Sequence, residues 1–485
     1  MSKLTRREFL GSTALAGAGL VLPGCSGAPS PRRLGPSDTI GLGFVGLRGR
    51  GNDLLGSFRK IPGVRVVGLC DVDPAVLDQR VTEARKLGEA PRAQSDARRL
   101  FDDPAIDAIV IATPNHTHAT LAIFAMQAGK DVYVEKPVTH SFHEGPALVA
   151  AARRYRRIVQ AGLQNRSDTG LVPAFADLHA GKFGAIRAVH GICYRDRAGI
   201  GKQATPIAPP SGLDYDLWLG PAQDLPILRD KFHYDWHWCW NTGNGDIGNQ
   251  GPHEIDLICW ALGDPGLPSE ILSIGGRLVW NDAGETPNAL VSWFQFPNSV
   301  PACFEVRNIV PKDDMPKPKR EFRGLAATGI VVRTSQGELR AQRGGAVFVD
   351  AAGATLSSYK GDSGATHQAN FVAALRAGDS KLLRTEVEPG EHSAAIAHLA
   401  NASYRLGSAG TLTDAQQLVA KLPLAGEHLE RMAANLQSHG VDTSRPLLSL
   451  GATVHRADSG DAYVAPDASG LKACLRREPR TGWAI

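Results

Sequence analysis

The stretch from Gly243 to Asp256 combines four glycines with several side chains that bind or transfer protons. His253 is a candidate general acid or base, because an imidazole titrates close to neutral pH. Asn249 can hydrogen-bond a substrate hydroxyl or orient His253, but an amide cannot take up a proton. Asp246 supplies a carboxylate here if the glycines allow the loop to curl. In the alternative interpretation, Asp246 caps the following helix and His253 is structural.

Lys136 is the second candidate for chemistry. It lies in the stretch Ala112–Ser141, which reads ATPNHTHATLAIFAMQAGKDVYVEKPVTHS. A strand ending at Glu135-Lys136-Pro137 would deliver the ammonium group to the edge of an open α/β sheet where ligands bind. A lysine acts as a base near neutral pH only when desolvation or a nearby cation lowers its pKa. Lys136 therefore either removes a proton from a hydroxyl group or positions that hydroxyl and a ribose.

The elements that must position these groups alternate between short β-branched runs and helix-length segments. The strand-like runs are 39–45, 64–71, 107–114, 131–137 and 157–164. Strands separated by helical segments predict a parallel, doubly wound sheet. The fold class expected for this part is therefore an α/β Rossmann domain.

A glycine-rich turn follows the first of these strands. The run GLGFVG (41–46) matches the dinucleotide fingerprint, but it leaves too few residues for the preceding strand. The better frame takes 39–45 as the strand and GLRGRG (46–51) as the turn, with a helix beginning near Asn52. Arg48 then stands where a second glycine usually admits the pyrophosphate, and either Gly49 supplies that freedom or the Arg48 or Arg50 guanidinium meets a phosphate.

The second strand ends at Asp71, about twenty-five residues after Gly46. A carboxylate at this place accepts hydrogen bonds from the adenosine ribose. No arginine follows at once, so the pattern favours NAD over NADP. With a nicotinamide beside Lys136, the chemistry expected is hydride transfer, with His253 or Lys136 removing the hydroxyl proton.

These motifs together resemble the Gfo/Idh/MocA oxidoreductases, the family of glucose-fructose oxidoreductase and inositol dehydrogenase. The resemblance runs from about Thr39 to Gly410 and includes the segment HLANASYRLG (398–407). It implies a Rossmann domain followed by a substrate-binding α+β domain with a large open, mainly antiparallel sheet, and a sugar or cyclitol that reacts between them. The residues expected to contact the cofactor are Gly46, Arg48, Gly49, Gly51, Asp71, Thr113, Asn115, His118, Glu135 and Lys136.

The opening stretch departs from the family pattern, which is Asp-x-Gly-x-His. Here the aligned residues are Asn249, Gly251 and His253, so the carboxylate is missing from its usual place. The resemblance makes His253 the acid or base, and leaves open whether Asp246 replaces the missing group. Asp256, one turn further on, is expected to be structural.

The rest of the chain supplies strands and helices for the second domain. Residues 288–296 and 301–310 read as a hairpin, and 328–353 as further antiparallel strands. The segments 366–378 and 391–407 are amphipathic, and we expect them to pack on that sheet. The expected divisions are 1–37, 38–165, 166–410 and a C-terminal extension at 411–485 without a catalytic motif.

Four tryptophans precede the glycine-rich stretch and fit two interpretations. Trp218, Trp236, Trp238 and Trp240 could line a sugar-binding cleft, or the last three could alternate along a strand with one buried face. His233 and His237 have the spacing of a metal pair, but no further ligand stands at a telling offset, so no metal is expected.

The first residues have the order of a targeting signal. Arg6 and Arg7 precede an apolar run from Gly11 to Leu22, which resembles a twin-arginine signal and is too short to span a bilayer. Cys25 is either a lipoprotein acylation site or part of a plain cleaved signal. We therefore expect an exported, periplasmic protein that uses the twin-arginine export machinery. In the lipoprotein alternative, an acyl chain on Cys25 anchors it to the membrane.

Composition limits the kinds of partner. The net charge of +4 on 485 residues is small and the basic residues are dispersed along the chain, so nucleic acid is not expected as a partner.

Three functions remain open: an exported dehydrogenase with tightly held NAD, an NAD-dependent glycoside hydrolase that works through transient C3 oxidation and elimination, and a non-catalytic nucleotide-binding accessory protein. The resemblance also implies a homo-oligomer.

Overall fold

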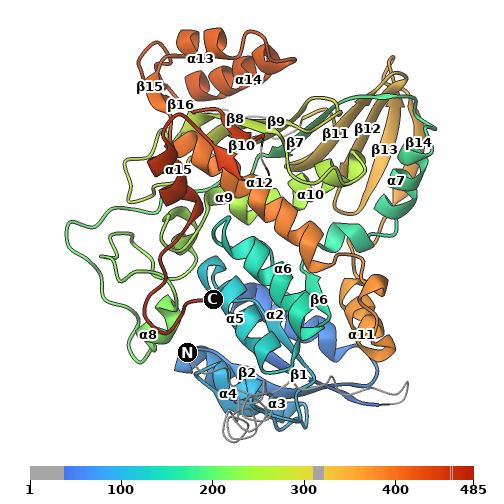
Figure 1. The fold of residues 1–485 in the computed structure, drawn as a ribbon, viewed down its shortest axis with the longest axis vertical. Coiled ribbons are helices and arrows are strands. Elements are labelled where there is room, and N and C mark those ends of the chain that lie inside the picture. Colours follow the sequence, from blue (N-terminus) through green and yellow to red (C-terminus); the bar gives the residue numbers. More distant parts are fainter. Residues whose placement is uncertain (1–37, 310–321, 459, 461) are drawn as a thin grey trace, which may run out of the picture.

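The computed structural model describes residues 38–309, 322–458, 460 and 462–485. The predicted signal and tether, Arg6, Arg7 and Cys25 included, lie outside the described residues. The described part of the chain forms two sheets with their covering helices (Figure 1). None of the described helices is both long enough and apolar enough to cross a membrane.

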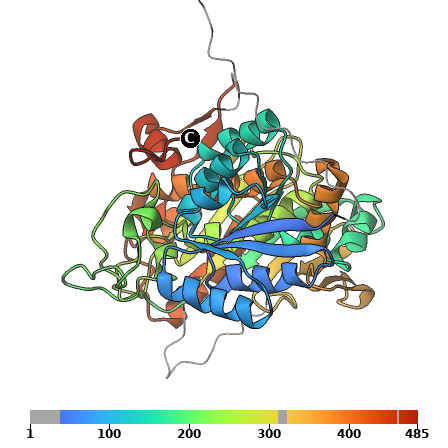
Figure 2. The same cartoon turned by 90° about the horizontal axis from the view of Figure 1, so that it is seen from below.

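The first sheet is the predicted Rossmann sheet. Its six strands are all parallel and lie in the order β3-β2-β1-β4-β5-β6. Their bounds are β1 Ile40–Val45, β2 Val64–Cys70, β3 Arg92–Gln94, β4 Ala108–Ile111, β5 Asp131–Val134 and β6 Val159–Ala161. The linking helices are α2 Gly49–Arg59, α3 Pro74–Lys86, α4 Arg98–Phe101, α5 His118–Gln127 and α6 Glu144–Tyr155. Figure 2 shows the sheet between two layers of helices, as the doubly wound prediction requires.

The turn after β1 confirms the chosen frame but corrects the start of the helix. Gly46 has a φ of +82°, and a Cβ there would lie 2.7 Å from the Ala112 carbonyl oxygen. Helix α2 begins at Gly49, three residues before the expected start at Asn52. The reason is that the turn at Gly46 is complete by Arg48, the residue that precedes the helix. Gly51 lies inside the first helical turn, where its missing side chain lets the helix approach the Gly46 carbonyl.

The second sheet has twelve strands and is mainly antiparallel, as predicted. Its main path is β14-β13-β12-β11-β7-β10-β9-β8-β16-β15, with one parallel pair between β7 and β10. The central strands are β7 Ile186–Cys193, β8 Glu270–Gly276, β9 Ala289–Gln295, β10 Ala302–Arg307 and β11 Thr328–Thr334. The remaining strands are β12 Gly337–Gln342, β13 Gly345–Asp350, β14 Thr355–Lys360, β15 Ser408–Gly410, β16 Leu448–Leu450, β17 Val454–Arg456 and β18 Tyr463–Val464. The predicted hairpin is the antiparallel pair of β9 and β10.

Helices cover one face of this sheet and connect it to the first domain. They are α7 Leu171–His179, α10 Gly251–Ala261 and α12 Val387–Arg405. In α12, Ile396 packs in the core of the second sheet, whereas Ala394 packs in the core of the Rossmann domain. The expectation for 391–407 therefore holds for part of the helix only, because α12 serves both domains.

The expectation for the amphipathic segment 366–378 is wrong. Its helix, α11 (His367–Ala377), packs on the Rossmann sheet instead of the second sheet. Phe371 makes edge contacts with Phe58 and Tyr133, at ring separations of 6.3 and 5.8 Å. Amphipathic spacing reveals that a helix has a buried face but not which surface buries it.

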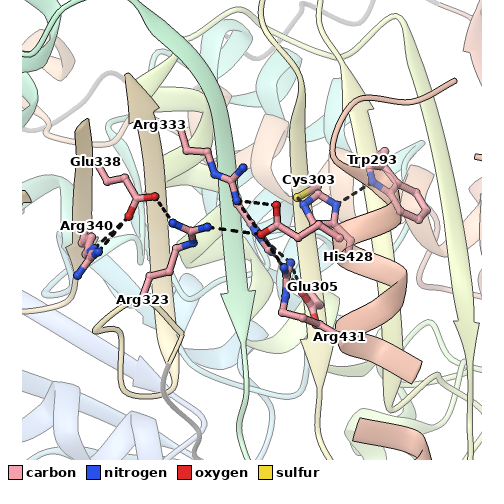
Figure 3. A network of polar contacts seen from close by, with 11 residues as sticks. Trp293, Cys303, Glu305, Arg323, Arg333, Glu338, Arg340, His428 and Arg431 are labelled. Atoms are coloured by element: carbon pink, nitrogen blue, oxygen red, sulfur yellow. Dashed lines mark hydrogen bonds and ion pairs between the residues drawn. The ribbon is translucent and has the colours of Figure 1, made fainter. Parts of the chain in front are cut away.

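The C-terminal extension covers part of the opposite face of the second sheet. Helices α13 (Leu412–Leu418) and α14 (Ala425–Ser438) share an apolar core with β8, β9 and β10. Ion pairs add to this contact. Glu427 of α14 lies 2.7 Å from Arg333. Arg431 of the same helix lies 3.3 Å from Glu305 (Figure 3). Helix α15 (Ala468–Leu475) then returns to pack on α12, through Leu471 and Leu475.

Beside this contact, the described residues include one group with the composition of a metal site. The candidate ligand atoms of His190, Cys303 and His428 lie within 4.8 Å of one another. The indole N–H of Trp293, however, donates to His428 Nδ1 at 3.0 Å. The proton of a neutral imidazole then sits on Nε2, which faces Cys303 and so has no lone pair for a cation. We assign this cluster to the packing of α14.

Buried histidines predict that the fold loses stability in acid. Burial lowers the pKa of His116, His237 and His428 from 6.5 to about 3, and that of His367 and His398 to about 4. Between pH 6.5 and these values the unfolded chain binds more protons than the folded chain. The free energy of unfolding should therefore fall as pH falls, by at most about 1.4 kcal/mol per pH unit for each histidine.

Buried carboxyl groups oppose this trend, and three of them have large shifts. Burial raises the pKa of Asp131 to about 6, of Glu391 to about 7 and of Glu254 to about 8, so these groups stabilise the folded state as pH falls. They are outnumbered by the five histidines, and the net loss should be measurable by urea unfolding at pH 7, 6 and 5. The His398→Gln variant should show a shallower loss than the wild type. A free energy of unfolding that is constant over this range would contradict the prediction.

Candidate functional site

One cavity of about 440 Å³ lies at the carboxyl ends of the parallel strands. Nine of the ten residues predicted to contact the cofactor line it, and these are Gly46, Arg48, Gly49, Asp71, Thr113, Asn115, His118, Glu135 and Lys136. The tenth, Gly51, lies beneath the turn against Gly46. The cavity thus follows the crevice in which an open α/β sheet holds its ligand.

Asp71 lies where β2 ends and also holds the glycine turn in place. One of its carboxylate oxygens accepts from the backbone N–H of Leu47 at 2.8 Å, and the other accepts from that of Asp73 at 3.0 Å. Burial raises the pKa of Asp71. Each oxygen keeps a further lone pair, so the side chain can still accept hydrogen bonds from a ribose.

The two arginines of the turn are both paired with carboxylates. Arg48 lies 2.6 Å from Asp73, and Arg50 lies 2.8 Å from the buried Glu135. Arg48 is half exposed and lines the cavity, as Arg50 does. To bind a phosphate, Arg48 or Arg50 would therefore have to bind it together with its carboxylate partner or release that partner.

Asn115 and His118 lie in the segment after β4, where η1 (Asn115–Thr117) leads into α5. Both ring nitrogens of His118 lie within 2.8 Å of backbone carbonyl oxygens, those of Pro137 and Thr113. His118 thereby links the segments that follow β4 and β5. Its role in the cavity wall is positional.

Lys136 approaches the glycine-rich stretch across the cavity. Its Nζ donates to the backbone carbonyl of Asn249 at 2.7 Å and lies 3.4 Å from the Asn249 side-chain oxygen. Burial lowers the pKa of Lys136, and the Arg50 guanidinium acts in the same direction against the opposing charge of Glu135. These are the conditions under which a lysine amine can act as a base.

Asp246 is linked to Lys136 through Asn249. The Asn249 amide donates to the Asp246 carboxylate at 2.9 Å, and the Arg197 guanidinium holds the same carboxylate at 2.8 and 3.1 Å. Asp246 is 1% exposed and acts on Lys136 through its charge, whereas the hydrogen bonds of Lys136 go to Asn249. The structure therefore brings Asp246, Asn249 and Lys136 into one chain of polar contacts, which Arg197 terminates.

The alternative interpretation of Asp246 as a helix cap is wrong. Asp246 lies inside a short helix, α9 (Gly245–Asn249), and the residue that caps α10 is Gln250. The two helices follow each other almost directly, so no loop remains for Asp246 to cap from. Gly245 is the first residue of α9 and has a φ of +67°, which glycine adopts without strain.

His253 lies in the first turn of α10 and is not part of the cavity lining. Its Nδ1 atom is buried and has no hydrogen-bond partner among the described residues. Burial lowers its pKa well below 6.5, and the positive charge of Lys136 adds to this effect. His253 is therefore a neutral imidazole whose Nδ1 atom has no partner among the described residues. It lies close enough to Lys136 for that positive charge to lower its pKa.

The aromatic segment before the glycine-rich stretch is not a strand. Residues Asp235–Trp238 form a 3₁₀ helix (η3), so the alternation of tryptophans does not mark a sheet face. Trp236 and Trp218 line the cavity, whereas Trp238 and Trp240 do not. His233 and His237, which we considered only as a metal pair, also line it.

Two further residues of this site were missed from the sequence. Arg197 holds Asp246, and Trp483 lines the cavity from the last residues of the chain. The density of histidine and tryptophan in 233–240, which suggested Trp236 as a cleft residue, could also have suggested His237. No signal in the sequence points to Arg197 or Trp483.

Comparison with protein families matches two segments of the chain. Residues 40–163 match the model described as "Oxidoreductase family, NAD-binding Rossmann fold". Residues 187–277 match the one described as "Oxidoreductase family, C-terminal alpha/beta domain". The N-terminal domain is therefore an NAD-binding Rossmann domain.

Curated relatives share part of the chain. A "Glycosyl hydrolase family 109 protein" of Shewanella pealeana is 32% identical over 174 residues, which are 32% of this chain and 38% of that protein. "Inositol 2-dehydrogenase 1" of Saccharopolyspora erythraea is 33% identical over 162 residues, which are 33% of this chain and 47% of that protein. The chain thus spans less than half the length of these two relatives.

Solved structures share the fold over most of the chain. The WlbA dehydrogenase from Bordetella pertussis, solved in complex with NADH and UDP-GlcNAcA, has a TM-score of 0.54 at 20% identity, covering 75% of this chain and 96% of that one. The aldose-aldose oxidoreductase from Caulobacter crescentus has a TM-score of 0.54 at 15% identity, covering 75% and 97%. At these identities the likeness concerns the fold alone.

Proposed function

The chain belongs to the Gfo/Idh/MocA family of NAD-binding oxidoreductases, and we propose that it is an exported enzyme that transfers hydride between a CH–OH group of a sugar, glycoside or cyclitol and NAD. The observation that carries the proposal is the position of Lys136, which shares one cavity with Asp71 and the turn at Gly46. Asp71 follows β2 and Lys136 follows β5, with β1 and β4 between them. An adenosine ribose and a nicotinamide lie at opposite ends of such a crevice.

The residues present fit NAD. A side chain at position 46 would collide with the Ala112 carbonyl, whereas a Cβ at Gly49 would meet nothing within 4 Å, so the turn is tight and still leaves space for a pyrophosphate. The cavity, at about 440 Å³, lies in the range of ligand pockets. NAD⁺, when bound, supplies the acceptor for the hydride that leaves the oxidised carbon.

We assign the proton transfer to Lys136. In this role the neutral amine takes the proton of the reacting hydroxyl, which its lowered pKa favours. The Asn249 carbonyl and side-chain oxygen orient the amine, while Arg197 and Asp246 hold the Asn249 amide. Burial and the charge of Lys136 lower the pKa of His253, which makes it a weaker base, and it does not line the cavity.

A second candidate is net glycoside hydrolysis with the same cofactor. In this reaction the sugar is oxidised transiently at C3, the aglycone is eliminated, water is added and the ring is reduced again. It is favoured by Asn249 in place of the usual aspartate and by relatives named glycosyl hydrolase family 109.

A third candidate, a nucleotide-binding accessory protein without turnover, is favoured by Arg48 in the phosphate turn.

Export and assembly are further parts of the proposal. Arg6, Arg7 and the apolar run after them support a twin-arginine route to the periplasm, and Cys25 supports a lipid anchor. Because that route carries folded proteins, the enzyme would leave the cytoplasm with NAD already bound. We also propose a homo-oligomer that uses the part of the second sheet that α13 and α14 leave free.

We expect the native protein to carry NAD after purification, because free NAD is scarce outside the cytoplasm. Mass spectrometry of the denatured protein tests this, and absence of the nucleotide would contradict tight binding.

A panel of glycosides and free sugars then separates the candidate functions when both nicotinamide reduction and sugar release are followed. Net reduction indicates a dehydrogenase, and sugar release without net NADH indicates a hydrolase. Unchanged NAD-dependent activity in a Lys136→Ala, His253→Ala variant would contradict both.

A further inference from the structure

The last ten residues of the chain cross from the second domain to the cofactor cavity. After α15 the chain runs past α8 (Tyr215–Leu219) and ends beside α5 (Figure 1). This segment, 476–485, lies outside both regions that match the family models. We call it the C-terminal strap.

The strap is attached at several points along its length. Arg477 donates to the Glu144 carboxylate at 2.5 Å and to the His116 carbonyl at 2.8 Å. Arg480 forms an ion pair with Asp216, and its backbone N–H donates to the Pro221 carbonyl at 3.3 Å. These contacts lead the chain to the edge of the Rossmann domain.

Trp483 is the residue that the strap delivers to the cavity. It is 6% exposed, lines the cavity and packs in the core of the Rossmann domain. Its ring stacks on Phe124 at 6.3 Å, and the Arg98 guanidinium lies 5.4 Å above it. The indole therefore borders the cavity as a large apolar side chain that Phe124 and Arg98 hold in place.

The position of Trp483 identifies which half of the dinucleotide it would meet. Residues 95–97, which follow β3, line the same cavity, and Ala97 belongs to the same apolar core as Trp483. Strand β3 is the edge strand next to β2, whose end carries Asp71. This is the adenosine side of the site, and Lys136 lies toward the other side, after β5.

We propose that the C-terminal strap completes the adenine end of the NAD site, that Trp483 forms a wall against which the base packs, and that the strap retards release of the cofactor. The inference rests on the NAD-dependent function proposed above. A large apolar ring at the border of the pocket offers the adenine base an apolar surface to pack against. A wall that must move before the adenosine half can leave also accounts for a cofactor that survives export.

The test compares NAD release from the wild-type chain and from Trp483→Ala. Both proteins are loaded with NAD, freed of excess nucleotide and diluted into NADH as competitor. We expect the variant to release NAD about tenfold faster or more, with a matching rise in Kd. Binding of nicotinamide mononucleotide, which lacks the adenosine half, should be unchanged.

Trp240→Ala is the matched control. Trp240 also carries an arginine over its ring, Arg405 at 5.0 Å, but does not line the cavity. Its NAD release should equal that of the wild type. Because Trp483→Ala could also loosen the core, Trp483→Phe serves as the second variant and should restore most of the retention.

Equal rates of NAD release for the wild type, Trp483→Ala and Trp483→Phe would contradict the proposed role of the strap but would leave the NAD-dependent function intact. Faster loss of both NAD and nicotinamide mononucleotide from Trp483→Ala would also overturn it, because the effect would then be general loosening. A wild-type chain that binds no NAD would instead defeat the proposed function, and the strap with it.

Discussion

Replacing Lys136 by methionine is expected to reduce kcat by about 10²- to 10⁴-fold. Methionine retains much of the length and the apolar contacts of lysine but cannot take the proton of the reacting hydroxyl. The Asn249 carbonyl would lose the donor that now lies 2.7 Å away. Turnover is measured with whichever sugar or glycoside reacts in the substrate panel, at saturating NAD.

Two companion measurements separate proton transfer from binding. The Kd for NAD should change only a few-fold, since Asp71 and the turn at Gly46 remain. Lys136→Arg keeps the positive charge but cannot lose its proton near neutral pH, so it should be nearly as inactive as Lys136→Met. Wild-type turnover in Lys136→Arg would show that Lys136 acts through its charge and is not the base.

Replacing Asp256 by asparagine is expected to lower the free energy of unfolding by about 3 kcal/mol. Asp256 is 1% exposed, and both of its carboxylate oxygens accept from the Arg166 guanidinium at 2.9 to 3.1 Å. Arg166 lies in η2 (Gln164–Ser167), directly after the last Rossmann strand, and Asp256 lies in α10. The substitution removes the negative charge and one of the two acceptor oxygens that face a buried guanidinium at the junction of the two domains.

Asp264→Asn is the matched control for this prediction. Asp264 binds the same guanidinium at 2.5 and 3.0 Å, but its side chain is 48% exposed. Water can replace an exposed partner, so this variant should lose less than about 1 kcal/mol. Urea unfolding of both variants measures the difference. Equal losses would mean that burial of the Asp256 pair does not decide its contribution.

Much of the first domain follows from the sequence because its signals are local. The strand ending at Val45, the turn at Gly46, the carboxylate at Asp71 and the lysine after β5 each lie within a single strand–helix unit. A parallel sheet then brings the carboxyl ends of its strands to one edge whatever the loops contain. Nine of the ten predicted cofactor residues therefore line one cavity.

The second domain was predictable in class but not in all its partners. Alternating hydrophobic residues and turn signals predict the hairpins of an antiparallel sheet, since neighbours in the chain pair in space. Helix α11 was assigned to the wrong sheet because a buried face does not carry the identity of its partner. The 3₁₀ helix at Asp235–Trp238 was open to misinterpretation because three tryptophans at alternate positions imitate a strand.

By itself, the sequence determined the Rossmann domain, its preference for NAD and the two segments that carry Lys136 and Asn249. Only the tertiary structure decided that Lys136 meets Asn249, that Arg197 neutralises Asp246 and that Trp483 borders the cavity. In each of these contacts the partners are separated by many residues along the chain. Such contacts arise when two sheets and the C-terminal strap pack together, and no local pattern of residue types encodes that packing.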